Sequence, residues 1–412
     1  MHKGVGVVNS SDANFYAIEN MDVSSVTYAV EFVDALIMCG ISSRASDIHI
    51  HPGKNHTQIK LRIDGKLLGG PKISKDRHES IISRLKVISG MNISEKRIPQ
   101  DGRLVKSVGE SEYDLRTATI ATVFGEKAVI RILEKDDFRF SIRNIGMTAD
   151  DVDKISSCIS GTGGMVLISG PTGSGKTTTL YSILNFIKRD SKNIITVEDP
   201  VEYTIGEVSQ IQVNRQIGLD FAKGLRAALR HDPDVIMIGE IRDNETASIA
   251  MRAAITGHLV LSTIHTNDSA STITRLLNMG IPPYIISAAL KCVISQRLLR
   301  VLCKSCKNIC SSTVAEKTAL YMAGYKTEDF YSAVGCRRCA GTGYYGRTGV
   351  YEVLCIDREL SDAIIQGQSQ QKIRDIANRK GMSTMLENAA RLVVDGTTSA
   401  EEISQLLVGE YL

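Results

Sequence analysis

The sequence predicts an α/β protein in which a small α+β domain precedes a larger domain built on a mostly parallel, doubly wound sheet. Three observations predict this class. Segments in which apolar and polar residues alternate recur between residues 42 and 135. Beyond residue 160, apolar strand-like runs alternate with helical patterns. A glycine-rich loop at 170–177 joins one such run to the helix that follows it.

The composition is that of a globular protein of two or three domains. The chain has 412 residues, of which 43% are hydrophobic. Its formal net charge of +3 creates no overall field, so charge alone does not imply a nucleic-acid partner. No run reaches the ~18 apolar residues of a membrane span, and Met1–Ser10 lacks a signal-peptide pattern. We therefore expect a cytoplasmic chain, in which nine cysteines argue against a disulfide framework.

The first part of the chain is predicted to form the small α+β domain, over residues 42–135. Residues 1–41 are a short lead-in with a helical apolar stripe over 26–38. Alternation predicts strands around Ile48 and over 59–63, with a tight turn at Asp64-Gly65. A further helix and two further strands are predicted at 81–88, 112–119 and 127–133.

Residues 136–160 are predicted as the linker to a second domain at 161–412. The segment opens with a charged run and lacks strong periodicity. A surface loop inside one domain is the alternative.

The glycine-rich loop fits the phosphate-binding pattern G-x-x-x-x-G-K-[ST] at every fixed position. Its glycines let backbone N–H groups approach an anion, and the helix N-terminus adds partial positive charge. Lys176 is predicted to reach the outer phosphates and Thr177 to ligate Mg²⁺. An ordinary glycine-rich turn is the alternative. The predicted nucleotide-binding residues are Gly170, Pro171, Thr172, Gly173, Ser174, Gly175, Lys176, Thr177 and Thr178.

Four predicted strands of the second domain end in polar residues. Because ligands sit at the carboxyl ends of parallel strands, these residues are expected to lie at one edge. The strands, with the residues that follow them, are 165–169 with the phosphate loop, 193–197 with Glu198 and Glu202, 234–238 with Glu240, and 259–264 with His265.

The polar residues at this edge suggest distinct roles. Glu240 follows an apolar run, where it can hold Mg²⁺ directly or through water. Glu198 and Glu202 both remain candidates for polarising the attacking water, which needs a carboxylate within hydrogen-bond reach. His258 and His265 flank one strand and are candidates for sensing phosphate, with a structural role as the alternative.

These residues resemble the secretion ATPases that drive type II secretion and type IV pilus assembly, over about residues 42–410. The resemblance rests on the phosphate loop, the acidic box Glu198-Asp199-Pro200-Val201-Glu202, the stretches Asp232-Pro233-Asp234 and Gly239-Glu240-Ile241-Arg242-Asp243, the histidine box between Thr256 and Asn267, and the N-terminal stretches Ser46-Asp47-Ile48-His49-Ile50 and Arg62-Ile63-Asp64-Gly65.

The resemblance implies a hexameric ATPase that uses ATP and Mg²⁺, in which a PAS-like domain is joined to a RecA-like domain. It implies Glu202 as the general base and places Glu240 at the Mg²⁺ site. Arg116 and Arg131 are implied to reach the phosphates, because a bidentate guanidinium stabilises phosphate charge. A surface ion pair is the alternative for each. Arg347 resembles a family arginine near the nucleotide.

The resemblance also implies partners. These are an inner-membrane platform protein and the cytoplasmic domains of a pilus or secretion assembly, through which the ATPase attaches peripherally to the inner membrane. With only about 40 residues ahead of the PAS-like domain, we expect no large extra N-terminal domain and a different mode of docking from that of the longest members. Whether the machine builds a pilus, secretes a protein or imports DNA stays open.

Two cysteine pairs, Cys303-x-x-Cys306 and Cys336-x-x-Cys339, predict a structural Zn²⁺ site. They are separated by 29 residues, and four thiolates would fill all positions of a tetrahedral ion. The insert, at about 300–345, is similar to that of secretion and pilus-assembly ATPases and is absent from the usual retraction ATPases. Buried cysteines unrelated to metal are the alternative. The remaining cysteines carry no such pattern: Cys39, Cys158, Cys292, Cys310 and Cys355.

Residues 357–412 are predicted as a helical C-terminal cap, with breaks at Gly381 and Gly396. Two other functions compete with a motor ATPase. A nucleic-acid translocase or conjugation-type ATPase would use a similar domain, but the near-neutral charge and the absence of Trp argue against it. A nucleotide-sensing scaffold that does not hydrolyse ATP is disfavoured by the intact Lys176, Thr177 and Glu240 together with Glu202.

Overall fold

The computed structural model describes residues 18, 25–135, 141–161, 163–188, 191–311, 313–325 and 329–410. The chain forms two compact units. Unit 1 comprises Met1–Asp136, Arg300–Cys310 and Tyr331–Arg347, and unit 2 comprises Asp137–Leu299, Ser311–Phe330 and Thr348–Leu412. Among the helices in the described ranges, none is both long enough and apolar enough to cross a bilayer.

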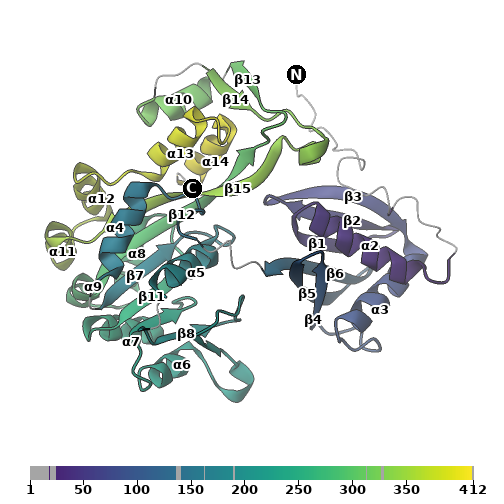
Figure 1. Cartoon of the computed structure of the whole chain (residues 1–412), viewed down its shortest axis with the longest axis horizontal. Coiled ribbons are helices and arrows are strands. Elements are labelled where there is room, and N and C mark those ends of the chain that lie inside the picture. Colours follow the sequence, from purple (N-terminus) through teal and green to yellow (C-terminus); the bar gives the residue numbers. More distant parts are fainter. Residues whose placement is uncertain are drawn as a thin grey trace. The chain divides into compact units, whose positions relative to one another are not determined.

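Unit 1 contains a six-stranded sheet in the order β3-β2-β1-β6-β5-β4, in which all neighbours are antiparallel. Figure 1 shows α2 and α3 against this sheet. The elements are α2 (Tyr28–Ser42), β1 (Ala45–Pro52), β2 (His56–Ile63), β3 (Lys66–Ser74), the short 3-10 helix η1 (Lys75–Arg77), α3 (His78–Ile88), β4 (Gln100–Val108), β5 (Ser111–Thr122) and β6 (Gly125–Lys135).

The core of unit 1 lies between these helices and one face of the sheet. Phe32 of α2, Leu85 of α3 and the strand residues Ile48 and Ile130 are fully buried there. Alternation places these strand side chains on the helix side and their neighbours in sequence on the opposite face. The turn predicted at Asp64-Gly65 is confirmed. It joins β2 to β3, and both residues have positive φ, 48° and 86°.

Unit 2 is organised around a seven-stranded sheet in the order β15-β12-β7-β11-β10-β8-β9. The pairs from β12 to β9 are parallel, so the predicted mostly parallel sheet is confirmed. The elements up to β12 are α4 (Ala149–Ile159), β7 (Gly164–Ser169), α5 (Lys176–Ile187), β8 (Ile194–Glu198), β9 (Ser209–Gln212), η3 (Arg215–Ile217), α6 (Phe221–Ala228), β10 (Val235–Ile238), α7 (Asn244–Ile255), β11 (Leu259–Ile264), α8 (Ser269–Asn278), α9 (Pro283–Ala289) and β12 (Leu290–Leu302).

Helices cover both faces of this sheet (Figure 1). Along β7, Met165 and Leu167 enter one hydrophobic cluster, to which α6, α7, α8 and α9 contribute. Val166 and Ile168 enter a second cluster on the other face, together with residues of α4 and α5. A strand buried on both faces requires the continuous apolar run that the sequence shows at 165–168.

Helix α4 lies inside the segment predicted as a linker. Its N-terminus has a complete capping box between Thr148 and Asp151, and Ile155 and Ile159 are buried in the core of unit 2. Residues 136–140 of the same segment lie outside the described residues. The proposed linker is accordingly shorter than 136–160 and ends before α4.

The remaining elements form the cysteine-bearing insert and the C-terminal helices. The predicted helical cap is confirmed, and Gly381 and Gly396 follow α12 and α13 with positive φ, 85° and 65°. The elements are β13 (Asn308–Ser311), α10 (Val314–Met322), β14 (Asp329–Ser332), η4 (Arg337–Cys339), β15 (Tyr344–Cys355), α11 (Arg358–Ile365), α12 (Gln370–Arg379), α13 (Met385–Val394) and α14 (Ala400–Glu410).

Candidate functional site

The phosphate-binding loop leaves the carboxyl end of β7 and leads into α5. Gly170, Gly173 and Gly175 have positive φ of 146°, 79° and 87°. A Cβ atom on Gly170 would lie 2.5 Å from the carbonyl oxygen of Gln296, so this position admits only glycine. Gly175 precedes the first residue of α5, and the N–H groups of that helix's first turn therefore face the loop.

Lys176 is buried above this loop. Its Nζ donates hydrogen bonds to the carbonyl oxygens of Gly170, at 2.7 Å, and Pro171, at 3.0 Å. Burial lowers the pKa of the ammonium group to about 8, against the opposing effect of the nearby Glu240 carboxylate. An anion in the loop would therefore restore the full positive charge of Lys176. Thr177, which follows it in the first turn of α5, is exposed.

His265 and Glu240 lie beside Lys176, at the carboxyl ends of β11 and β10. His265 Nδ1 lies 3.5 Å from Lys176 Nζ, and His265 Nε2 lies 3.4 Å from Glu240 Oε2. Arg242 donates to the other oxygen of Glu240. Burial opposes ionisation of Glu240, but Arg242 and His265 outweigh it and lower the pKa of the carboxyl group. The structure thus brings three of the predicted residues together as one charged group.

Glu198 ends β8 and is committed to hydrogen bonds within the protein. Its carboxylate accepts from the hydroxyl groups of Tyr181 and Thr196 and from Gln210 Nε2, the last two at 2.6 and 3.0 Å. Only 3% of the residue is exposed. Burial, and then the charge of Glu198, raise the pKa of Tyr181, which keeps it a donor. Glu202, four residues further along, is half-buried in the segment after β8.

His258 lies at the amino end of β11, away from the phosphate loop. Its carbonyl oxygen accepts from the N–H of Gly164, the first residue of β7, whereas the phosphate loop begins after the last residue of β7. The His258 ring lies 3.1 Å from the carbonyl oxygen of Ala253. Of the two histidines predicted to sense phosphate, His265 therefore lies beside the phosphate loop and His258 does not. The length of the strand, about 3.3 Å per residue, separates them.

Sequence reasoning missed Gln296 and gave no role to Arg242. Gln296 is buried on β12, behind the phosphate loop, where its side chain accepts a 2.7 Å hydrogen bond from Thr179 of α5. A Cβ atom on Gly175 would lie 2.9 Å from its Nε2. No local pattern marks Gln296, because its role depends on β12 pairing with β7. Arg242 stands in a motif but could be linked to Glu240 only through the structure.

Arg116 and Arg131 belong to unit 1, where they are directly opposite each other on β5 and β6. The same register places Arg103 opposite Arg116, and places Asp47 opposite both Arg131 and Arg62. Directly opposed residues share a face, so these side chains form a row across five strands, on the face away from Ile48. We call Arg62, Arg103, Arg116 and Arg131 the arginine row.

Two aspartates partly neutralise the positive charge of the arginine row. Asp47 Oδ1 lies 3.1 Å from Arg131 Nε, and Asp114 lies 2.6 Å from Arg103 Nε and 3.7 Å from Arg116 Nε. Four guanidinium groups against these two carboxylates leave an excess of positive charge. Such a surface favours anions. Arg347 also belongs to unit 1, where it is exposed on β15.

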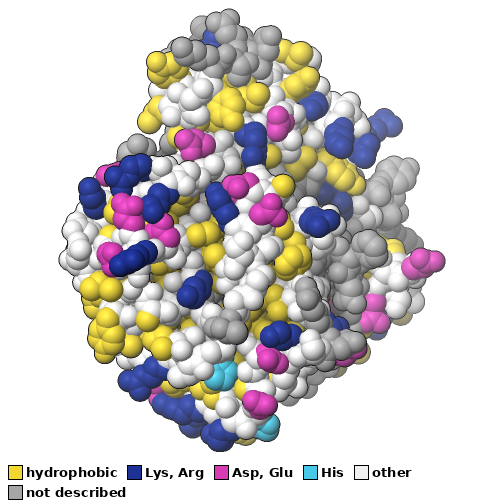
Figure 2. Space-filling model, turned by 60° about the vertical axis from the view of Figure 1, so that its left-hand side comes forward, with side chains coloured by type: hydrophobic (Ala, Val, Ile, Leu, Met, Phe, Trp, Pro, Cys, Tyr) yellow, Lys and Arg dark blue, Asp and Glu magenta, His cyan; other side chains and the backbone are white. Residues whose placement is uncertain are grey.

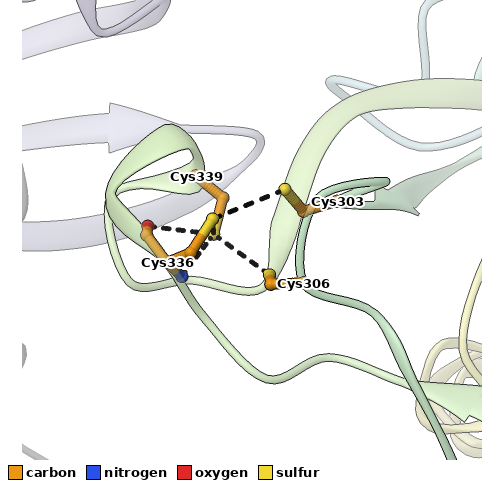
Figure 3. Close-up of side chains that lie close together, drawn as sticks. All are labelled: Cys303, Cys306, Cys336 and Cys339. Atoms are coloured by element: carbon orange, nitrogen blue, oxygen red, sulfur yellow. Dashed lines mark hydrogen bonds between the residues drawn. The ribbon is translucent and has the colours of Figure 1, made fainter.

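The four cysteines of the two predicted pairs converge in unit 1 (Figure 3). Sγ separations are 3.9 Å for Cys303 and Cys336, 3.8 Å for Cys306 and Cys339, and 3.8 Å for Cys336 and Cys339. Zinc–sulfur bonds of about 2.3 Å in a tetrahedron require sulfur separations of about 3.8 Å, so the cluster fits Zn²⁺. Backbone N–H groups of Cys336 and Gly343 donate to Cys339 Sγ, which orients this sulfur toward the other three.

The insert that carries these cysteines contacts the turn between β2 and β3 and the connection between α2 and β1, all within unit 1. The N–H of Gly346 donates a 3.0 Å hydrogen bond to an Asp64 carboxylate oxygen. The guanidinium group of Arg44 lies 3.5 Å from the centre of the Tyr345 ring, a cation–π contact. The cysteine cluster therefore lies in the same compact unit as the arginine row.

A parallel sheet with a phosphate loop after one strand, and with Glu240 and His265 after two neighbouring strands, defines a P-loop nucleoside triphosphatase. Comparison with known proteins refines this class. Residues 23–405 match the family described as type II/IV secretion system protein.

Two curated relatives are similar over most of the chain. The type IV pilus assembly ATPase PilB of Thermus thermophilus is 46% identical over 91% of this chain, which spans 42% of that relative's length. The type II secretion system protein HxcR of Pseudomonas aeruginosa is 41% identical over 93% of this chain, which spans 78% of that relative.

Solved structures share the fold. The pilus retraction motor PilT with bound ADP has a TM-score of 0.60 and 26% identity, covering 91% of this chain and 96% of that one. The ATPase DotB of Legionella pneumophila has a TM-score of 0.69 and 24% identity, covering 95% and 98%. The chain belongs to the type II/IV secretion system protein family, and the resemblance inferred from its motifs is confirmed.

Proposed function

We propose that the chain is a motor ATPase that hydrolyses ATP to power the assembly of a type IV pilus or a type II secretion pseudopilus. The observation that carries this proposal is the convergence of Lys176, His265 and Glu240 beside the phosphate loop. The choice of machine is supported by the relatives, which are named as a pilus assembly ATPase and a type II secretion protein.

In this proposal the loop residues 170–178 bind the triphosphate. Backbone N–H groups opened by the three positive-φ glycines donate to phosphate oxygens, and Lys176 turns from the loop carbonyls to the outer phosphates. Thr177 and Glu240 are the residues that would hold Mg²⁺, which when bound neutralises charge on the outer phosphates. Arg242 and His265 hold Glu240 ionised for that task.

Glu202 is the better candidate for the general base. A base needs a carboxylate that can accept a proton from water, whereas all the described contacts of Glu198 use its oxygens within a buried network. Glu202 is half-buried and lies on a loop at the same edge of the sheet. Glu198 then positions Tyr181 and the segment after β8 and does not touch the nucleotide.

The arginine row is proposed to supply Arg116 and Arg131 to the phosphates. Its excess positive charge favours an anion, and guanidinium groups bind phosphate in a bidentate manner. The arginine row belongs to unit 1 and the phosphate loop to unit 2. Nucleotide bound in the loop would therefore attract the arginine row and favour a closed arrangement of a unit 1 and a unit 2. Loss of the outer phosphate would weaken that attraction and allow the units to separate.

We further propose a homohexamer that works at the cytoplasmic side of the inner membrane through a platform protein. In such a ring, closure of one subunit would move the neighbouring subunit, and this movement would provide the mechanical work. The four-cysteine cluster would hold a structural Zn²⁺. The PAS-like character of the first domain and the role of Arg347 near the nucleotide rest on the family resemblance and belong to the same proposal.

A nucleic-acid translocase is the competing function. Figure 2 shows basic and acidic side chains interspersed over much of the face that it presents, in keeping with the formal net charge of +3. Tight, salt-dependent binding of nucleic acid draws on clustered Lys and Arg. Stimulation of hydrolysis by DNA or RNA would favour this alternative.

The test is Mg²⁺-dependent release of phosphate from ATP by the purified chain. Lys176→Ala should abolish it, because the charge that positions the outer phosphates is lost. Lys188→Ala is the control, since Lys188 lies at the other end of α5 and pairs with Glu207. A chain without ATPase activity, or a Lys176→Ala variant that retains it, would contradict the proposal.

A further inference from the structure

Three cysteines to which the sequence pattern gave no role meet in unit 2. They are Cys158 at the end of α4, Cys292 at the start of β12 and Cys355 at the end of β15, and their Sγ atoms all lie within 4.8 Å of one another. Cys158 Sγ lies 3.7 Å from Cys355 Sγ and 3.8 Å from the carbonyl oxygen of Lys291. We call these three residues the thiol trio.

The thiol trio is separate from the nucleotide site. Cys292 is paired in register with Val166 near the amino end of β7, whereas the phosphate loop leaves the carboxyl end of that strand. Cys292 is fully buried, and Cys158 and Cys355 are partly exposed. A small solute can therefore reach the trio without entering the nucleotide site.

The surroundings of the thiol trio shift the pKa values of its members in different directions. Hydrogen bonding with the Cys292 and Cys355 thiols, together with the charge of Lys291, lowers the pKa of Cys158, although burial opposes the shift. The same contact with Cys158 raises the pKa of Cys355. Cys158 is therefore the thiol of the trio that ionises most readily, and the Cys355 sulfur lies 3.7 Å from it. A readily ionised cysteine with a second thiol beside it is the pairing that peroxide oxidation and disulfide formation require.

We propose that the thiol trio is an oxidative modification site, at which a hydroperoxide oxidises Cys158 and Cys355 resolves the product as a disulfide. The Cys158 thiolate attacks one peroxide oxygen, so an S–O bond forms, the O–O bond breaks and the leaving oxygen departs as hydroxide or alkoxide. Cys355 sulfur then attacks Cys158 sulfur. The S–S bond forms, the S–O bond breaks, and the hydroxide takes the Cys355 proton to leave as water.

The peroxide is the oxidant in this reaction. The hydroxide or alkoxide that leaves in the first step takes a proton from solvent, so each disulfide consumes one peroxide and releases one water together with a second water or an alcohol. Forming the disulfide requires the two sulfur atoms to approach from 3.7 Å to a bond of about 2.05 Å. The product would tie the end of α4 to the end of β15, while Cys292 stays a thiol.

A metal is the less favoured occupant of the same sulfurs. Within the described ranges, the cluster contains these three ligands and no fourth Cys, His, Asp or Glu, whereas structural zinc takes four. Binding would also require ionisation of Cys292, whose pKa is raised well above the ordinary value by its contacts with Cys158 and Cys355 and then by burial.

The test is cysteine mapping by mass spectrometry after brief treatment of the full chain with hydrogen peroxide. We expect a linked pair of peptides containing Cys158 and Cys355, with a loss of two hydrogens that dithiothreitol reverses. Two other cysteines in the same sample are internal controls. Cys310 is exposed and outside both clusters, so it should not enter a specific disulfide, and buried Cys39, whose pKa burial raises to about 11, should stay reduced.

Two variants test the order of events. Cys355→Ser should stop at a Cys158 sulfenic acid that a cyclic 1,3-dione traps, whereas Cys158→Ser should leave Cys355 reduced. Absence of the linked pair in the wild-type chain would overturn the proposal, whatever the variants do. Trapping of sulfenic acid on Cys355 in place of Cys158, or a metal ion retained by the trio that blocks oxidation, would also overturn it. None of these readouts depends on ATP hydrolysis.

Discussion

His265 Nε2 lies 3.4 Å from Glu240 Oε2, and the other nitrogen of the same ring faces Lys176 Nζ at 3.5 Å. One imidazole ring can contact both neighbours at once, because each of its two nitrogens faces one of them. His265 therefore couples the proposed phosphate-binding and Mg²⁺-binding side chains without being placed to attack the substrate itself.

The first prediction concerns this coupling. His265→Ala should lower kcat by about 10-fold to 100-fold, the usual cost of losing a group that orients a metal ligand, while the KM for ATP changes little. His265→Asn, which keeps an acceptor near the position of Nδ1, should retain more activity than His265→Ala. Steady-state kinetics of both variants beside His258→Ala provide the measurement. An equal loss of kcat in all three variants would contradict the proposed role of His265 beside the Mg²⁺-binding side chain.

The second prediction is a pH dependence of ATP affinity. Burial holds the pKa of Lys176 at about 8 in the nucleotide-free protein, so the group is charged below that pH and becomes neutral above it. A bound phosphate favours the charged form. Affinity should therefore change little well below pH 8, fall about fivefold between pH 8 and 9, and approach a tenfold loss per pH unit above that.

Calorimetry in two buffers of different ionisation enthalpy would detect the proton taken up on binding near pH 8.5. In Lys176→Arg the guanidinium group stays charged, and the pH dependence should disappear. An affinity that is flat to pH 9.5 in the wild-type chain would contradict the assignment of this titration to Lys176.

The third prediction distinguishes the roles of Glu202 and Glu198. Glu202→Gln should bind ATP but not cleave it, with an unchanged melting temperature. Glu198→Gln exchanges an acceptor that receives three hydrogen bonds for an amide that cannot accept them all, so it should cost about 1–3 kcal/mol of folding stability. Thermal unfolding and single-turnover hydrolysis distinguish the two. If Glu202→Gln turns over ATP at the wild-type rate, Glu198 becomes the candidate base.

The fourth prediction concerns zinc. Metal analysis of protein purified without chelator should find one Zn²⁺ per chain, and Cys303→Ser should lose it. Hydrogen exchange should then rise over 300–310 and 331–347, because the metal holds the two cysteine pairs together, while the phosphate loop stays protected. Cys310→Ser is the control and should keep the metal. A zinc-free wild-type protein with the same protection would rule the site out.

The fifth prediction concerns the arginine row. Arg116→Ala and Arg131→Ala should lower turnover far more than ATP affinity, because the guanidinium groups are proposed to act once the units close around nucleotide. Arg97→Ala is the control, since Arg97 is 87% exposed and pairs only locally, with Glu95. A non-hydrolysable ATP analogue should favour the hexamer in sedimentation. A chain that stays monomeric with every nucleotide, with both variants fully active, would remove the mechanical part of the proposal.

Much of the fold could be predicted because the decisive signals are local. The run 165–168, the glycine loop and the first residues of α5 are adjacent in sequence, and the strands that carry Glu240 and His265 are short apolar runs. The sequence does not predict helix α4, because Asp150, Asp153 and Lys154 surround a narrow apolar stripe in which Ile155 and Ile159 are buried and Val152 is partly buried. A helix that packs through one narrow apolar face is hard to predict from its composition, because most of its residues are charged or polar.

The rest of the site depends on contacts between residues far apart in sequence. The position of His258 follows from the register between β11 and β7, and that of Gln296 from the pairing of β12 with β7. The thiol trio joins residues 158, 292 and 355, which no spacing rule connects. A sequence pattern specifies which strand a residue ends, but the neighbour of that strand is set only by the assembled sheet.

The hydrogen bond from Gly346 to Asp64 has a consequence for dissecting the protein. Unit 1 is discontinuous: the chain passes between the units at 136/137, 299/300, 310/311, 330/331 and 347/348. A protease that cuts between 136 and 148 therefore leaves unit 1 joined to unit 2 through the two long strands β12 and β15. A fragment that ends at residue 136 would lack the four clustered cysteines of unit 1 and the Gly346 N–H that donates to Asp64, so the first domain cannot be isolated whole by a single truncation.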